Sequence, residues 1–264
     1  MTSLKKLQNI SLIFFTMISL NTLSAQETDR EFYQIKIYSF ASQEQVDKAD
    51  NFFENAYLPA LKKQGIENVG VFKPREMAPG DTLQKVYVLL PFTSLDQIAG
   101  LQDKLDADAQ FQSAGKDFIT TSYDNPPYVR IQSIILKAFE KMPQLKPSAV
   151  TGTREDRVYE LRSYQSPTVA YHQNKVKMFN DGGEVALFKK LSFNAVFYGE
   201  VISGPDMPNL MYMTTFTDQK SRDEHWKSFS DAPEWKKLSA LPEYQNNVSH
   251  IDITFLHPTS YSDY

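Results

Sequence analysis

The 264-residue sequence contains no cysteine, which excludes disulfide bonds, thiolate metal sites and cysteine nucleophiles. It also lacks an excess of positive charge, with 28 Lys and Arg residues against 32 Asp and Glu residues. Proteins that bind nucleic acid through its phosphates carry basic surfaces, so this balance disfavours such a partner. No glycine-rich phosphate loop, nucleophile elbow or His-Glu-x-x-His motif is present. These absences remove the common NTPase, serine hydrolase and zinc protease classes.

The most apolar run lies near the start of the chain. Lys5 and Lys6 precede an apolar stretch at 10–20, and small and polar residues follow up to Ala25. This order is typical of a secretory signal peptide, which we predict at 1–25; an uncleaved anchor is the alternative. The run is shorter than the ~20 apolar residues that cross a bilayer. We therefore predict an exported, soluble protein, periplasmic or secreted, without an integral membrane segment after cleavage.

A tandem repeat organises the rest of the chain. Tyr33 aligns with Tyr159 and Tyr38 aligns with Tyr164, each pair at an offset of 126 residues. In each repeat, the two tyrosines belong to a segment that shows the period-two alternation of a β-strand. The spacing predicts two related domains, at 30–140 and 157–258, with a polar, proline-containing linker at 141–156.

Each repeat has the pattern of a β-α-β-β-α-β unit. In the first, strands are expected at 32–40, 68–73, 85–91 and 128–139, with helical segments at 43–63 and 95–119. In the second, strands are expected at 157–165, 193–202, 210–216 and 248–257, with helices at 168–190 and 220–229. This order is that of a ferredoxin-like domain, in which two helices cover one face of an antiparallel sheet. The predicted fold class is α+β.

Three segments of the second repeat resemble the NIPSNAP family: Tyr-Glu-Leu-Arg-Ser-Tyr at 159–164, Ala-Val-Phe-Tyr-Gly at 195–199 and Asp-Ala-Pro-Glu-Trp at 231–235. The resemblance extends over roughly 157–244. The first repeat is similar to a diverged copy, with Gln34 and Lys36 in place of the Glu and Arg, and Phe111 at the position of the tryptophan.

The resemblance implies a fold of the dimeric α/β-barrel superfamily, in which two ferredoxin-like units pair their sheets face to face. Because this chain carries both units, it is expected to form a pseudo-dimeric barrel by itself. Related barrels include cofactor-independent monooxygenases and haem-binding enzymes. NIPSNAP proteins have no settled catalytic residues, so the resemblance implies no catalytic residue here.

Strand alternation selects the candidate site residues. On the last strand, His250 and Asp252 are expected to point into the barrel, because they alternate with residues expected to pack under the helices (their parity along the strand). On the strand 157–165, Tyr159 is expected to face the helices. The same alternation then points Glu160 and Arg162 into the barrel. Four ionisable groups would then converge on one sheet face inside the barrel.

This convergence has two interpretations. The structural one is a buried ion pair of Arg162 with Glu160 or Asp252 that fixes how the sheets meet. The functional one is a pocket in which Arg162 binds an anionic or carbonyl-bearing ligand and His250 or Glu160 transfers a proton. The ligand-binding candidates are Glu160, Arg162, Tyr198, His250 and Asp252, and the catalytic candidates are His250 and Glu160.

Other polar residues give weaker signals. The corresponding positions of the first repeat hold Gln34, Lys36, Arg130 and Gln132, so any pocket is expected to be asymmetric and centred on the second repeat. His172 and His225 are expected on helix surfaces and share no ligand spacing with His250, so no metal site is predicted. Trp226 and Trp235 are expected to pack the second helix against the sheet, with sugar stacking as the alternative.

Two functions follow from these observations. The first is an exported NIPSNAP-like protein that binds a small molecule or a partner through the barrel, without catalysis. The second is a cofactor-independent or haem-assisted oxidoreductase or monooxygenase that acts in the barrel cavity. The sequence identifies neither ligand nor cofactor, and it leaves open whether the protein forms homo-oligomers.

Overall fold

The computed structural model describes residues 29–78 and 80–264. The predicted signal segment, 1–25, lies outside the described residues. The strands of the first unit are β1 (Phe32–Phe40), β2 (Gly70–Pro74), β3 (Gln84–Phe92) and β4 (Arg130–Ala138). Those of the second are β5 (Val158–Gln165), β6 (Asn194–Ser203), β7 (Asn209–Phe216) and β8 (His250–Pro258). Each strand overlaps a strand expected from the sequence.

The helices follow the expected order with more interruptions. In the first unit they are α1 (Gln43–Phe52), the π-helical turn η1 (Phe53–Tyr57), α2 (Leu58–Lys63), α3 (Leu95–Asp106), α4 (Ala109–Ala114) and α5 (Lys116–Ile119). In the second they are α6 (Val169–Asn180), α7 (Glu184–Lys190), α8 (Gln219–Asp231), α9 (Pro233–Ser239) and the 3₁₀ turn η2 (Pro242–Tyr244).

Two of these interruptions have local causes. The π-turn ends two residues before Pro59, whose ring and missing N–H disturb the preceding helical turn. The helix expected at 168–190 is broken between α6 and α7, where Gly183 has a φ of 90°. Glycine adopts this left-handed backbone without the steric cost that a Cβ would bring. The Gly182-Gly183 pair is therefore the sequence signal for the break.

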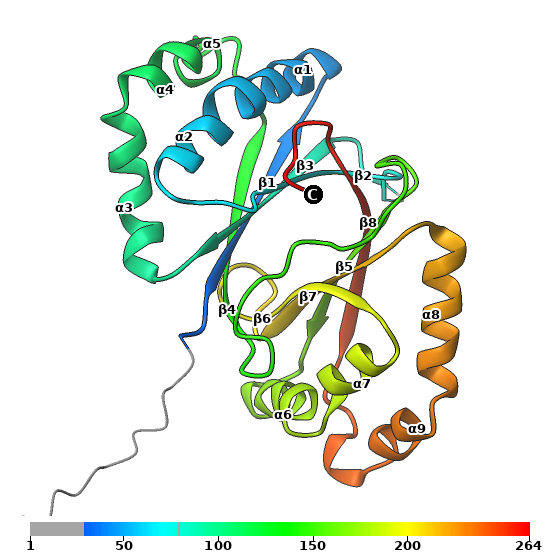
Figure 1. Ribbon diagram of the computed structural model, residues 1–264. Coiled ribbons are helices and arrows are strands. Elements are labelled where there is room, and N and C mark those ends of the chain that lie inside the picture. Colours follow the sequence, from blue (N-terminus) through cyan, green and yellow to red (C-terminus); the bar gives the residue numbers. More distant parts are fainter. Residues whose placement is uncertain (1–28, 79) are drawn as a thin grey trace, which may run out of the picture.

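The eight strands form a closed barrel in the order β1-β3-β2-β8-β5-β7-β6-β4. Each unit contributes a four-stranded antiparallel sheet, and the pairs β2–β8 and β4–β6 join the two sheets (Figure 1). The structure thus confirms two ferredoxin-like units that close into one pseudo-dimeric α/β barrel within a single chain.

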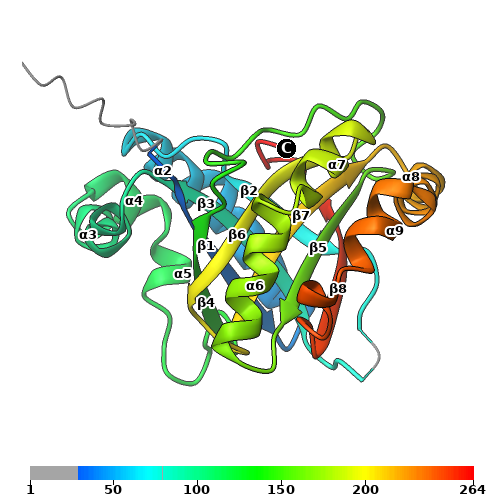
Figure 2. The same ribbon diagram turned by 90° about the horizontal axis from the view of Figure 1, so that it is seen from below.

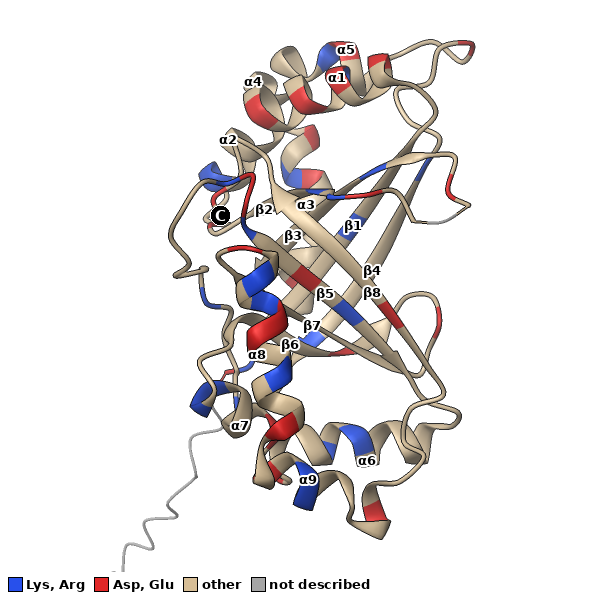
Figure 3. Cartoon of the chain, turned by 90° about the vertical axis from the view of Figure 1, so that its right-hand side faces the viewer, with Lys and Arg blue, Asp and Glu red and all other residues tan. Residues whose placement is uncertain are grey.

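The packing forms three main hydrophobic cores. One fills the barrel, and each of the others lies between one sheet and its own helices. The helices of the two units lie on opposite sides of the barrel (Figure 1), and α6 lies over the outside of the second sheet (Figure 2). Figure 3 shows basic and acidic residues interspersed along α8 and α9.

Two segments outside the strands close one end of the barrel. In the linker, the N–H of Leu145 donates to Glu31 Oε2 at 2.6 Å. After β8, the N–H of Thr259 donates to the carbonyl of Val71 at 2.9 Å, and this segment places the Tyr264 ring in the barrel core. The Tyr264 ring lies 5.5 Å from that of Phe72, centroid to centroid. Both segments therefore cover the same end of the barrel.

Within the described chain, none of the helices has the length and apolar character needed to cross a bilayer.

Candidate functional site

The structure corrects the orientation predicted for Glu160 and Arg162. Tyr159 is fully buried inside the barrel, with its ring centroid 5.0 Å from that of Phe72. Glu160 and Arg162 therefore point the other way, under the helices, and contact Trp226 of α8. The prediction was wrong because β5 is covered on both faces, so alternation alone does not distinguish the inside of the barrel from the outside.

Under α8, Glu160 is the centre of a buried ion cluster. Its Oε1 accepts from Arg162 Nε at 2.7 Å and from Arg222 Nη2 at 2.8 Å. Its Oε2 accepts from Arg222 Nε at 2.9 Å and from Trp226 Nε1 at 2.7 Å. The guanidinium of Arg162 also stacks 3.7 Å from the Trp226 ring centroid, a cation–π contact.

The charges around Glu160 determine its protonation. Burial alone would raise its pKa, but the hydrogen bond from Arg222 and the charges of Arg162 and Arg222 hold the pKa below its ordinary value of 4.5. Arg162 further donates to the hydroxyl of Tyr164 at 3.0 Å. The expected Glu160–Arg162 ion pair is thus present, but it does not lie between the two sheets: through Arg222 and Trp226 it fastens α8 to the second sheet.

Tyr198 also lies on the helix side. Its ring stacks on that of Tyr212 at 5.6 Å between centroids, and 2% of the residue is exposed. Trp226 and Trp235 pack in the same outer core, as expected for residues that hold the second helix against the sheet. Glu160, Arg162 and Tyr198 are thus separated from the barrel interior by the sheet.

His250 and Asp252 lie where parity predicted, on the barrel side of β8, near its open end. His250 Nε2 is 3.0 Å from Asp252 Oδ1, and Gln165 Nε2 donates to Asp252 Oδ2 at 2.9 Å. Their side chains are 59% and 55% exposed. The four ionisable candidates therefore do not converge: two lie under α8 and two lie at the barrel mouth.

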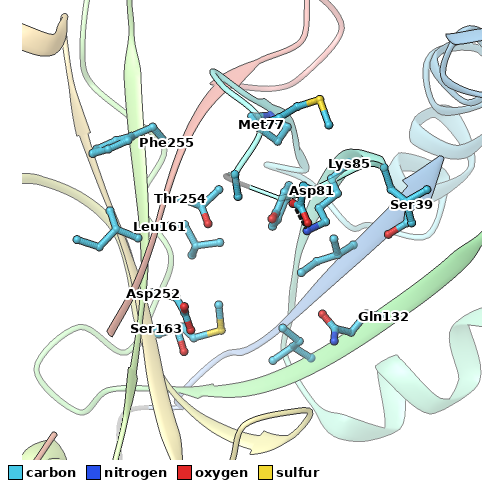
Figure 4. Close-up of a pocket in the computed structure, with 18 of the residues that line it drawn as sticks. Ser39, Met77, Asp81, Lys85, Gln132, Leu161, Ser163, Asp252, Thr254 and Phe255 are labelled. Atoms are coloured by element: carbon cyan, nitrogen blue, oxygen red, sulfur yellow. Dashed lines mark hydrogen bonds and ion pairs between the residues drawn. The ribbon is translucent and has the colours of Figure 1, made fainter. Parts of the chain in front are cut away.

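A cavity of about 1180 Å³ opens at this mouth and is lined by both units (Figure 4). Its apolar lining residues include Ile37, Ile134, Leu161 and Met211. Its polar lining residues include Ser39, Gln132, Ser163, Asn209, Asp252 and Thr254. Of the five ligand-binding candidates from the sequence, only Asp252 lines this cavity. A lining that mixes apolar and polar side chains suits a largely apolar molecule that carries polar substituents.

The loop between β2 and β3 forms a further wall of the cavity. Asp81 Oδ2 accepts from Lys85 Nζ at 2.6 Å, an ion pair visible in Figure 4. Arg75 donates to the carbonyls of Glu155 at 2.7 Å and Arg157 at 2.9 Å, which ties this loop to the start of the second unit.

Tyr87 of β3 contributes a phenol to the same wall. Burial raises its pKa above the ordinary value of 10.0, with a partial offset from the charge of Lys85. The phenol is therefore protonated at neutral pH and can donate a hydrogen bond to a ligand.

Over residues 29–78 and 80–264, no group of three or more His, Asp or Glu side chains could hold a metal ion. None of the four histidines lines the cavity, so the wall offers no imidazole to a haem iron. His172, expected on a helix surface, is 4% exposed and lies 3.2 Å from Glu200 Oε1.

Sequence reasoning missed Ser163, Asn209 and Tyr87 as cavity residues. Correct parity on β5 would have found Ser163, because it lies on the same face of the strand as Tyr159 and Leu161. Tyr87 and Asn209 become candidates only once the pairing of the strands is known, since Tyr87 lies opposite Ile37 and Asn209 lies opposite Gln165.

Fold and site together define a tandem ferredoxin-like α/β barrel with an open cavity at one end. Residues 159–263 match the NIPSNAP family model, which confirms the resemblance of the second repeat to that family. No curated protein sequence matches the chain.

Solved structures with the same fold include three that align with most of the chain. A proposed monooxygenase from Lactobacillus acidophilus has a TM-score of 0.55 at 12% identity, covering 87% of this chain and 94% of its own. One from Fusobacterium nucleatum has a TM-score of 0.54 at 7% identity, covering 88% and 93%. An anthrone oxidase-like protein has a TM-score of 0.52 at 8% identity, covering 88% and 93%. At these identities the likeness extends to the fold alone.

Proposed function

We propose that this protein binds a small, largely apolar molecule in the cavity at the barrel mouth. The observation that carries the proposal is the cavity of about 1180 Å³ whose apolar and polar lining residues come from both units. Its volume slightly exceeds the range of about 300–1,000 Å³ that is usual for small-molecule sites. Asp252, already hydrogen-bonded to Gln165, would orient a polar group of the ligand at the rim.

Filling the cavity tests this proposal. Ile37 lines the cavity and is only partly buried, so Ile37→Trp places an indole there with little repacking. We expect at least about tenfold weaker binding of anilinonaphthalene sulfonate, an apolar fluorescent probe, because the indole occupies its volume. The measurement is a fluorescence titration, together with native mass spectrometry of protein from its own source for a copurifying molecule.

The matched control is Val169→Trp, which adds the same indole on α6, where Val169 is 60% exposed. This variant should bind the probe as the unmodified protein does. Equal binding by Ile37→Trp and the unmodified protein would place the probe elsewhere and contradict the proposal.

A second candidate is a cofactor-independent oxidation in the same cavity. It is supported by the fold likeness to an anthrone oxidase-like protein and by Asp252, a carboxylate at the cavity rim beside His250. The reaction considered is the conversion of an activated methylene group and O₂ to a ketone and water. One oxygen atom enters the substrate, and the other leaves as water with the two hydrogens of the methylene.

Anthrone and an oxygen electrode would test this candidate. Asp252 would accept the proton of the methylene group, and His250 would position its carboxylate. We expect one O₂ consumed per anthrone, with the rate lowered strongly in Asp252→Asn. A rate in the unmodified protein equal to that in buffer would contradict the candidate and leave the binding role intact.

A further inference from the structure

The first half of β8 has a neighbouring strand on one side only. β8 pairs with β5 from His250 to Leu256, but it pairs with β2 only from Leu256 to Pro258. The N–H of Arg75 adds one bond, to the carbonyl of Phe255 at 2.8 Å. In the described chain, no strand pairs with residues 250–254 on the β2 side. These residues therefore form an open strand edge at the barrel mouth.

The backbone along this open edge is free to bond. In an antiparallel strand, the N–H and C=O groups of successive residues point to alternate neighbours. Because the carbonyl of Phe255 points towards β2, the backbone groups of Ile253 and Ile251 point to the same, open side. The two isoleucines are also 43% and 44% exposed. An open edge that carries exposed apolar side chains is a template for an added strand.

A carboxylate lies between the two isoleucines. Asp252 points to the barrel side, lines the cavity and has a side chain that is 55% exposed. Glu76 and Asp206 line the same cavity, and neither forms an ion pair with another described residue. The mouth beside the open edge therefore presents accessible negative charge.

The basic residues of the cavity lining do not neutralise Asp252. Arg75 donates to the carbonyls of Glu155 and Arg157, and Lys85 is paired with Asp81 at 2.6 Å. Arg130 lies on β4, which is not a neighbour of β8 in the barrel. A basic side chain supplied by a bound molecule would therefore complement the charge at this edge.

The first unit has a similar edge without the acid. β4 pairs with β6 only from Ile135 onwards, so the first residues of β4 are also open. Gln132 lies opposite Ile37, just as Asp252 lies opposite Ser163, and Ile37 and Ser163 are related by the repeat offset of 126. An amide thus replaces the carboxylate in the first unit, and only the edge of β8 selects for a basic partner.

The charge on this edge also disfavours a second copy of the chain. An antiparallel ladder between two copies that uses both Ile251 and Ile253 would place each Asp252 opposite the other. Like charges directly opposite each other destabilise a pair of strands. The complementary partner is therefore a different polypeptide.

We infer that the open edge of β8 binds an extended segment of another polypeptide in which a lysine or arginine lies between two apolar residues. The two apolar residues pair with Ile251 and Ile253 and extend the sheet by one strand. The basic side chain lies opposite Asp252, at the mouth of the cavity. This interaction surface goes beyond the small-molecule binding proposed above.

A five-residue peptide, Thr-Val-Lys-Val-Thr with a fluorescent label, tests the inference by fluorescence polarisation. We expect saturable binding of this peptide by the unmodified protein. Thr-Val-Glu-Val-Thr should bind about fivefold to thirtyfold more weakly, because a cross-strand attraction becomes a repulsion. The lysine peptide with both valine nitrogens methylated should not bind, because it lacks the N–H groups that face the open edge.

Charge reversal in the protein locates the binding. Asp252→Lys should reverse the preference, so that the glutamate peptide binds more tightly than the lysine peptide; this gain also shows that the variant is folded. The matched control is Asp103→Lys, which makes the same charge change on α3, where Asp103 is exposed. This control should keep the preference for the lysine peptide.

Four results would overturn the inference: no binding of the lysine peptide, equal binding of the lysine and glutamate peptides, binding of the methylated peptide, or an unchanged preference in Asp252→Lys. Sedimentation of the unmodified protein as a dimer that excludes the peptide would assign the edge to a second copy and overturn it as well. The small-molecule role of the cavity is tested separately, by the dye titration of Ile37→Trp.

Discussion

Replacement of Glu160 by glutamine is expected to lower the free energy of unfolding by about 3–5 kcal/mol, the range for removing one partner of a buried ion pair. Glu160 has no exposed surface and accepts from Arg162, Arg222 and Trp226. Glutamine keeps the volume but removes the charge, so two guanidinium groups would face each other without a compensating carboxylate. Guanidinium chloride unfolding measures the loss.

The control for this variant is Asp223→Asn. Asp223 also pairs with Arg222, at 3.0 Å, but its side chain is 59% exposed, so its removal should change stability little. A Glu160→Gln variant as stable as Asp223→Asn would contradict the role assigned to the cluster under α8.

The same carboxylate predicts part of the pH dependence of stability. Its pKa in the folded protein lies below the ordinary value of 4.5, so its contribution is present above that pH and is lost as the pH falls through the folded pKa. Glu160→Gln should therefore show a flatter decline of stability on acidification below about pH 5. A decline as steep as that of the unmodified protein would assign the acid sensitivity to other carboxylates.

Replacement of Lys175 by methionine is the second change with a large expected effect. Lys175 of α6 and Glu184 of α7 form an ion pair at 2.8 Å, with side chains 6% and 2% exposed. Methionine keeps the apolar stem but leaves Glu184 buried without a counter-charge. The expected loss of stability at neutral pH is about 3–5 kcal/mol, measured by chemical unfolding.

The double variant Lys175→Met with Glu184→Leu is the matched control. It removes both charges, and apolar replacement of a buried pair is often neutral or stabilising, so most of the loss should be recovered. A double variant as unstable as Lys175→Met would show that packing between α6 and α7, rather than the unpaired charge, causes the loss.

The pH dependence at Glu184 has the opposite sign to that at Glu160. Burial raises the pKa of Glu184 despite the charge and hydrogen bond of Lys175. A carboxyl with a raised folded pKa favours the folded state at low pH, and this contribution is lost as the pH rises through the folded pKa. Lys175→Met should raise that pKa further, so its stability deficit should shrink as the pH is lowered towards 5, in about the range where buried carboxyls titrate.

The sequence by itself determined the repeat and the fold. The tyrosine spacing and the period-two and helical patterns placed eight strands in β-α-β-β-α-β order, because local alternation reflects which side chains are buried. The N-cap of α1 is local in the same way: the side chain of Ser42 accepts from the N–H of Gln45, an interaction between near neighbours in the chain. Parity also placed Asp252 correctly, on the barrel side of β8.

Only the tertiary structure decided which face of β5 lines the barrel. Both faces are buried, one against the opposite sheet and one under α6 and α8, so Tyr159 and Glu160 are equally covered. Alternation shows that neighbouring side chains point to opposite faces, but it does not show which of the two cores each face enters. For this reason Glu160 and Arg162 were expected in the pocket, whereas the structure places them in the ion cluster under α8. The cavity and the open edge of β8 depend on strand pairing and barrel closure, which join residues more than 40 positions apart.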